Sequence, residues 1–80
     1  MQKALSEPPV LNWDSVIHKV ARTKDGDPAG YIAADDEKSI YILSSRFREY
    51  RVPKRQVLAF DGSAVLINLE SGELSRYQIQ

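Results

Sequence analysis

The chain has 80 residues, no cysteine, and equal numbers of basic and acidic side chains, 11 of each. This length suits one small domain with a modest core, and the absence of cysteine excludes disulfides and thiolate-bound zinc. A formal net charge of zero argues against binding of nucleic acid or membranes through bulk charge, and no apolar run could span a bilayer. The first residues lack the apolar core of a secretory signal, so a cytoplasmic protein is expected.

The amino-terminal part is predicted to be a tail followed by an arm. Pro8 and Pro9 prevent a helix or a paired strand from running through them, so residues 1–10 are predicted to be a flexible tail and residues 11–80 a single domain. The segment 10–18 has two interpretations. It could form a helix capped by Asn12 or Asp14, or an irregular arm that packs its apolar residues on the domain. The β-branched residues that follow favour the arm.

From Lys19 onward the sequence predicts short strands separated by tight turns. Strand-like segments lie at 19–23, 30–34, 39–43, 47–52, 57–60 and 64–69. Gly26 and the pair Asp61-Gly62 mark turns, and Pro53 ends the fourth segment because proline has no N–H to donate. Residues 70–77 suit only a short helix. The prediction is an all-β fold: a small closed or partly open β-barrel of about six short strands, with a short C-terminal helical turn.

Few side chains are candidates for chemistry. His18 is the one histidine, and no local motif pairs it with a serine nucleophile or with further metal ligands. The turns carry acids of the kind that calcium prefers, but their spacing is not that of an EF-hand, and tight turns favour Asp and Gly in any case. These acids are Asp25, Asp27, Asp35, Asp36 and Glu37. We therefore expect a non-enzyme with no catalytic residue, no metal, no cofactor and no small-molecule substrate.

Charge is distributed unevenly along the chain. Residues 46–55 hold five of the 11 basic residues and one of the 11 acidic residues. Strand alternation places Tyr50 with Val52 on one face, which indicates a core position for Tyr50. An acidic protein surface, RNA, or solvent alone could face the cations, because arginine and aromatic residues serve protein interfaces as well as base stacking. The predicted partner-binding residues are Arg46, Phe47, Arg48, Arg51, Lys54 and Arg55, with Phe47 as aromatic anchor if it lies outward.

Three segments resemble motifs of a known family. Residues 23–32 resemble an opening hairpin with a turn glycine and a strand glycine, residues 50–57 a crossing between strands around Pro53, and residues 61–69 a closing hairpin. In this way the stretch from Val20 to Leu69 resembles the PRC-barrel superfamily. These small β-barrels occur in the photosynthetic reaction centre H subunit, in the ribosome-maturation factor RimM, and as short stand-alone archaeal proteins. Pro28 and Ala29 depart from the acidic and large apolar pair expected before the strand glycine.

The resemblance implies recognition without catalysis. We expect a protein–protein interaction adaptor, with homodimerisation as one form of that recognition, in an archaeal cytoplasmic complex such as the cell-division machinery. The alternative is an RNA- or ribosome-associated module that uses the basic segment 46–55. RimM-like members contact a ribosomal protein and ribosomal RNA, but they do so with a second domain that this sequence does not contain.

Overall fold

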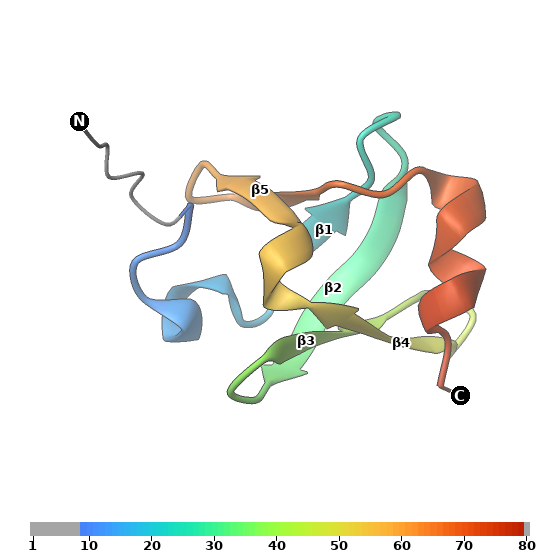
Figure 1. The fold of residues 1–80 in the computed structure, drawn as a ribbon, viewed down its shortest axis with the longest axis horizontal. Coiled ribbons are helices and arrows are strands. Elements are labelled where there is room, and N and C mark those ends of the chain that lie inside the picture. Colours follow the sequence, from blue (N-terminus) through green and yellow to red (C-terminus); the bar gives the residue numbers. More distant parts are fainter. Residues whose placement is uncertain (1–8, 80) are drawn as a thin grey trace.

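A computed structural model describes residues 9–79, which form one six-stranded sheet and three short 3-10 helices (Figure 1). The strands are β1 (Val20–Arg22), β2 (Pro28–Asp35), β3 (Ser39–Leu43), β4 (Glu49–Pro53), β5 (Val57–Phe60) and β6 (Ala64–Ile67). The helices are η1 (Trp13–Val16), η2 (Lys54–Gln56) and η3 (Ser71–Tyr77). An all-β fold was predicted, and the structure is mostly β; the six short strands and the C-terminal helical turn are confirmed.

The sheet has two free ends and is not a closed barrel. Its strand order is β4-β3-β2-β1-β6-β5, antiparallel throughout except for the parallel pair β1–β6. Of the two predicted forms, the closed barrel is therefore wrong. The chain turns from β4 to β5 through η2, where Lys54 N–H donates to the Lys38 carbonyl at 2.8 Å and the Gln56 carbonyl accepts from Asn68 N–H at 2.7 Å. This corner is held by separate hydrogen bonds instead of a strand ladder.

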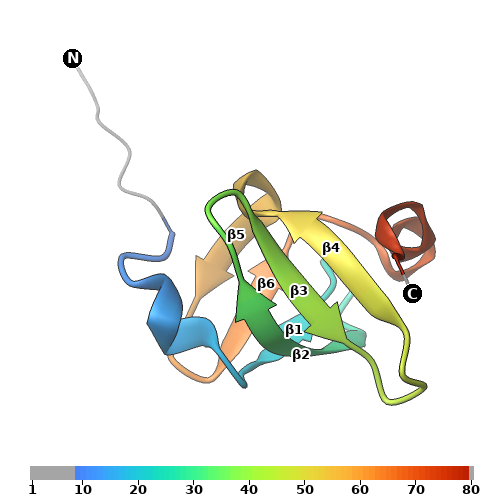
Figure 2. The ribbon, with the colours of Figure 1, turned by 90° about the horizontal axis from the view of Figure 1, so that it is seen from below.

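Three irregularities in pairing let the sheet curl around its core. They lie between Ala21 and Arg22, between Ile32 and Ala34, and between Val57 and Ala59, and such irregularities bend a strand and increase its twist. Figure 2 shows the strands wrapped around a common interior. The predicted alternation on β4 is confirmed, because its inward side chains are buried and those between them point outward. The largest fully buried apolar residues are Val16, Ile32, Ile40, Ile42, Val52, Val65 and Ile67.

Gly30 of β2 lies so close to the end of β3 that no side chain fits there. Its φ is +140°, and a Cβ at this position would collide with the Leu43 carbonyl group and would lie 2.9 Å from the Ser44 Cα. Contacts of that length do not occur between a real Cβ and backbone, so only glycine fits. The close packing of β2 against the end of β3 therefore depends on the missing side chain.

The amino-terminal arm is partly helical and part of the core. Asn12 caps η1, because its Oδ1 accepts from Asp14 N–H at 3.0 Å, so the interpretation of an irregular arm is wrong for residues 13–16. Val10, which the sequence assigned to the tail, is only 3% exposed and joins the core with Val16. The remainder of the predicted tail, residues 1–8, lies outside the described residues.

The carboxyl-terminal segment covers the outer edge of β4. Glu70 N–H donates to the Glu73 side chain at 2.8 Å as part of a capping box that starts η3, and Leu74 is buried beneath it. After the helix, Gln78 forms an isolated bridge with Tyr50, and the next N–H donates to the Glu49 carbonyl at 2.8 Å. Figure 2 shows η3 lying beside β4. One sheet edge is thereby shielded by the chain itself.

Gly30→Ala is expected to destabilise the protein by about 3 kcal/mol or more, because the added methyl group meets backbone atoms that cannot move without breaking the β2–β3 pairing. Gly72→Ala is the matched control. Its Cβ would meet nothing within 4 Å, so this change should leave stability unchanged or raise it by about 0.5 kcal/mol. Urea unfolding followed by circular dichroism measures both. Equal stabilities of the two variants would contradict the close approach at Gly30.

Asp25 joins the β1–β2 turn to the start of η3. Its carboxylate accepts from the Thr23 hydroxyl, from Ser71 N–H at 3.2 Å and from the Ser71 hydroxyl at 3.0 Å. The Thr23 hydrogen bond is the main cause that holds the pKa of Asp25 below its usual value of 3.8, and the Ser71 bonds act in the same direction. Since the folded pKa is depressed, this stabilisation is present above about pH 4 and is lost as the pH falls through the folded pKa.

Asp25→Asn is therefore expected to lower the free energy of unfolding at pH 7, and its deficit relative to the unsubstituted protein should shrink at pH 3. Urea titrations at the two pH values measure this. Asp27→Asn is the control, because it makes the same charge change in the same exposed turn without a contact to η3. Its difference in free energy of unfolding from the unsubstituted protein should not shrink between pH 7 and pH 3. A deficit of Asp25→Asn that is constant with pH would contradict the proposed link.

Candidate functional site

The turn between β3 and β4, residues 44–48, is held tightly by a single serine. Ser44 N–H donates to the Arg48 carbonyl at 2.9 Å, and the Ser44 carbonyl accepts from Phe47 N–H at 3.0 Å. The Ser44 hydroxyl oxygen accepts from the N–H groups of Arg46 and Arg48 at 3.3 and 3.2 Å. Four hydrogen bonds across five residues fix the turn, which projects from the end of the sheet in Figure 2.

Phe47 sits at the tip of this turn in an unfavourable conformation. Its φ is 62°, in the left-handed region that suits glycine or asparagine, and its side chain is 83% exposed. A bulky residue in this region costs about 1 kcal/mol or more, and here no burial offsets that cost. The predicted strand 47–52 starts two residues too early, since β4 begins at Glu49. Phe47 does lie outward, as its predicted role requires.

The six predicted partner-binding residues do not form one surface. Arg46, Phe47 and Arg48 lie in the turn, and Arg51 lies on the outer side of β4, paired with Tyr41. The two remaining cations belong to η2, at the other end of β4. Because an extended strand rises about 3.3 Å per residue, the length of β4 places them roughly 15 Å or more from the turn.

Lys54 is engaged within the fold. Its Nζ lies 2.8 Å from the Asp35 carboxylate and 4.7 Å from the centroid of the Trp13 ring. These contacts join η1 and the end of β2 to the corner between β4 and β5. Lys54 is therefore a structural residue, while its neighbour Arg55 is exposed. Between residues 9 and 79 no ion pair joins Arg46 or Arg48 to an acid.

A hollow that the sequence analysis missed lies beside the turn. It measures about 450 Å³, and we call it the outer hollow. The pairing register aligns Val20 with Tyr31 and Tyr31 with Leu43, so these outward side chains form a row across β1, β2 and β3. The full lining is Val20, Pro28, Ala29, Gly30, Tyr31, Leu43, Ser44 and Ser45. Of these residues only Tyr31 could have indicated the hollow from the sequence, because an aromatic residue next to the buried Ile32 on a strand points to the outer face.

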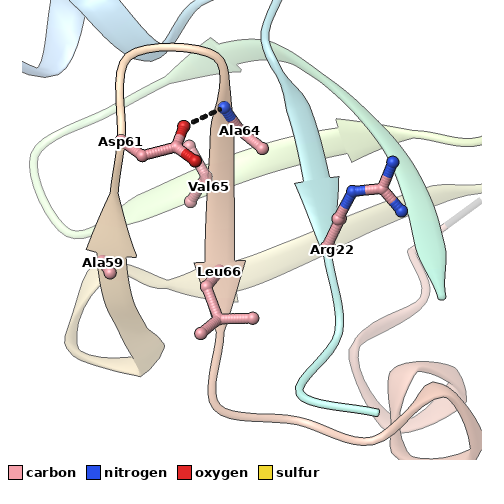
Figure 3. Close-up of a pocket in the computed structure, with 6 residues that line it drawn as sticks. All are labelled: Arg22, Ala59, Asp61, Ala64, Val65 and Leu66. Atoms are coloured by element: carbon pink, nitrogen blue, oxygen red, sulfur yellow. Dashed lines mark hydrogen bonds between the residues drawn. The ribbon is translucent and has the colours of Figure 1, made fainter. Parts of the chain in front are cut away.

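A second hollow, of about 250 Å³, lies over β5 and β6 and offers no acid–base pair (Figure 3). Its two charged side chains lie on opposite sides of β6 and are held by the backbone. Asp61 accepts from the N–H groups of Ser63 and Ala64, both at 2.8 Å, and these bonds hold the pKa of its carboxyl below the usual range. Arg22 donates to the Gly26 carbonyl at 3.2 Å. Both side chains thus stabilise turns.

The other predicted candidates for chemistry are likewise structural or isolated. His18 is exposed, with φ 71°, and its backbone N–H donates to the Ile32 carbonyl at 2.7 Å. The Asp36 carboxylate accepts from the Tyr41 hydroxyl at 2.6 Å, which is the main cause of its lowered pKa. Across the described part of the chain, no three His, Asp or Glu side chains are grouped so that they could hold a metal ion.

Comparisons with protein-family models, with curated proteins and with solved structures found no match for this chain. Among residues 9–79, no helix is both long and apolar enough to cross a membrane. The candidate site therefore rests on its own geometry. It consists of an exposed aromatic residue between two unpaired arginines, on a fixed turn beside an apolar hollow.

Phe47→Asn is expected to raise the free energy of unfolding by about 0.5–1 kcal/mol, because asparagine tolerates positive φ and the phenyl ring buries almost nothing. Leu58→Asn is the control, since it removes another exposed apolar side chain, 48% exposed, at a residue without positive φ. It should give no gain. Thermal and urea unfolding measure both variants. A loss of stability in Phe47→Asn would show that the ring supports the fold.

Proposed function

We propose that this protein is a non-catalytic adaptor that binds an acidic protein surface through the β3–β4 turn. The observation that carries the proposal is Phe47, exposed and in the left-handed region between two free arginines. Strained conformations of this kind cluster where a function requires them, and the exposed phenyl ring adds no burial to the fold. Phenylalanine and arginine are also enriched in protein interfaces relative to the rest of the surface.

The fixed turn supports tight binding in two ways. Its four hydrogen bonds to Ser44 order the backbone before any partner arrives, so little conformational entropy is lost on docking. Arg46 and Arg48 would accelerate the encounter with an acidic partner by long-range attraction. Phe47 would then supply the apolar contact that keeps the complex together.

The distribution of cations favours a protein over RNA. A strand-tracking RNA site needs cations along a continuous groove, with exposed rings on which bases stack. Here Arg46 and Arg48 lie at one end of β4 and Arg55 at the other, with Arg51 alone between them, and Lys54 is engaged with Asp35 and Trp13. Tyr50, the second aromatic residue of the segment, is buried. Three exposed side chains at one turn suit an anchor in a protein pocket better than a path for a nucleic acid.

From the sequence resemblance to the PRC-barrel superfamily we further propose that the adaptor acts in an archaeal cytoplasmic complex, such as the cell-division machinery. The three segments that carry the resemblance are residues 23–32, 50–57 and 61–69. They fall in the β1–β2 hairpin, at the β4–η2–β5 corner and in the β5–β6 hairpin. A partly open barrel is compatible with a curled sheet whose two end strands meet at a 3-10 corner. A second copy of the chain is also a protein surface, and light scattering of the purified protein would reveal such a homodimer.

The test is a pull-down of the tagged full chain from native lysate, with and without nuclease, analysed by mass spectrometry. Partners should persist after nuclease, and recovery should fall about tenfold or more for Arg46→Glu/Arg48→Glu and for Phe47→Asn. Lys24→Glu/Arg76→Glu, the same charge change at exposed positions outside the turn, is the control and should capture normally. Loss of every partner on nuclease treatment, or equal capture by the turn variants, would overturn the proposal.

A further inference from the structure

We propose that the outer hollow and the β3–β4 turn form one binding site for an extended acidic peptide segment, whose large apolar side chain enters the hollow. This inference rests on the proposed function. It deepens that function by naming the chemistry of the partner, and it extends the site from the turn onto the outer face of β1, β2 and β3.

The hollow has the size and the lining of a side-chain pocket. About 450 Å³ lies within the range of sites that take small ligands or anchor residues. Its walls are apolar except for two serines, and no charged side chain lines it. The Tyr31 side chain is 43% exposed although it sits in the middle of the longest strand. An apolar side chain from a partner would remove this ring from water, which is favourable in proportion to the area covered.

Part of the hollow's lining is backbone at Gly30, a position where no side chain would fit. Gly30 lies in the lining, and its close approach to the Leu43 carbonyl group keeps this part of the sheet fixed. The hollow is therefore rigid on two sides, at the β2–β3 contact and at the turn held by Ser44. A preformed hollow of this kind loses little entropy when it is filled.

The turn and the hollow are continuous. Ser44 and Ser45 belong to the lining, and Arg46 follows directly, with neighbouring Cα atoms about 3.8 Å apart. The site thus has an apolar centre with two cations along one side, the layout of an energetic anchor with a charged rim. Arg46 and Arg48 have no acidic partner among the described residues, so a bound segment with carboxylates would meet them and a basic segment would be repelled.

These positions also predict the spacing in the bound segment. Alternate side chains of an extended peptide point the same way and lie about 6.6 Å apart. With the large apolar side chain in the hollow, an acid two residues away is within reach of the long Arg46 side chain. We therefore expect recognition of a large apolar residue with Asp or Glu within about three positions on one side.

The experiment is a selection of random twelve-residue peptides on the immobilised full chain, followed by fluorescence anisotropy with a labelled peptide of the enriched sequence. The enriched peptides should combine a large apolar residue with nearby acids. Tyr31→Ser should weaken binding about tenfold or more. Leu66→Ser, at an exposed apolar position on the same face but in the other hollow, is the control and should bind normally.

Two further variants make the test specific. Ser45→Trp, at an exposed turn position, fills the hollow without removing a packed side chain and should also abolish binding. A peptide with its acids replaced by lysine should bind Arg46→Glu/Arg48→Glu more tightly than it binds the unsubstituted protein. Thermal unfolding of each variant shows whether it is folded. If Tyr31→Ser does not fold, Ser45→Trp decides whether the hollow binds the peptide.

The outcomes separate this inference from the proposed function. Selection of peptides without acids, no selection at all, or unchanged binding by Tyr31→Ser and Ser45→Trp overturns the inference. If lysate partners survive nuclease and depend on Phe47 while Tyr31→Ser captures them normally, the adaptor function stands and the peptide site does not. If partners are lost with nuclease, the adaptor function fails, whatever the selection returns.

Discussion

The close approach of β2 to β3 at Gly30 is the constraint on which the rest of the structure depends. Because no Cβ intervenes, the backbone of β2 packs directly against the end of β3, next to the irregular pairing that lets the sheet curl around its core. The same contact aligns Tyr31 beside Leu43 on the outer face and directs the chain into the β3–β4 turn. The feature that closes the interior thus also shapes the outer surface beside the turn.

A short curled sheet has two end strands whose edges expose unpaired backbone groups. In this chain different segments pack at β4 and at the corner before β5. The carboxyl-terminal segment bonds to the edge of β4, while η1 and the Lys54–Asp35 pair brace the corner that leads into β5. This bracing removes one cation from the basic segment 46–55. The exposed cations that remain are Arg46 and Arg48 in the turn, Arg51 on β4 and Arg55 on η2.

Local patterns predicted much of the fold. The short run of β-branched and aromatic residues at 39–43 and the hairpin segment at 57–60 coincide with β3 and β5, and Gly26 and Gly62 adopt the positive φ expected of turn glycines. The outer hollow could not be predicted, because its row of side chains comes from three strands and depends on register. The prediction of a closed barrel was wrong for a related reason. Whether the two end strands pair depends on contacts between distant parts of the chain, which local patterns do not show. Val10 was misassigned because two prolines before it suggested a tail.

Stability and recognition are divided between different residues of the same hairpin. Tyr50 and Val52 are buried and hold β4 to the core, whereas Phe47 is exposed and strains its backbone. A residue that only closed a turn would be glycine or asparagine at this φ, because either removes the steric cost. The exposed phenyl ring offers no burial to offset that cost within the monomer. Under the proposed function, a partner bound at Phe47 would lie next to the apolar row that begins beside the turn at Leu43.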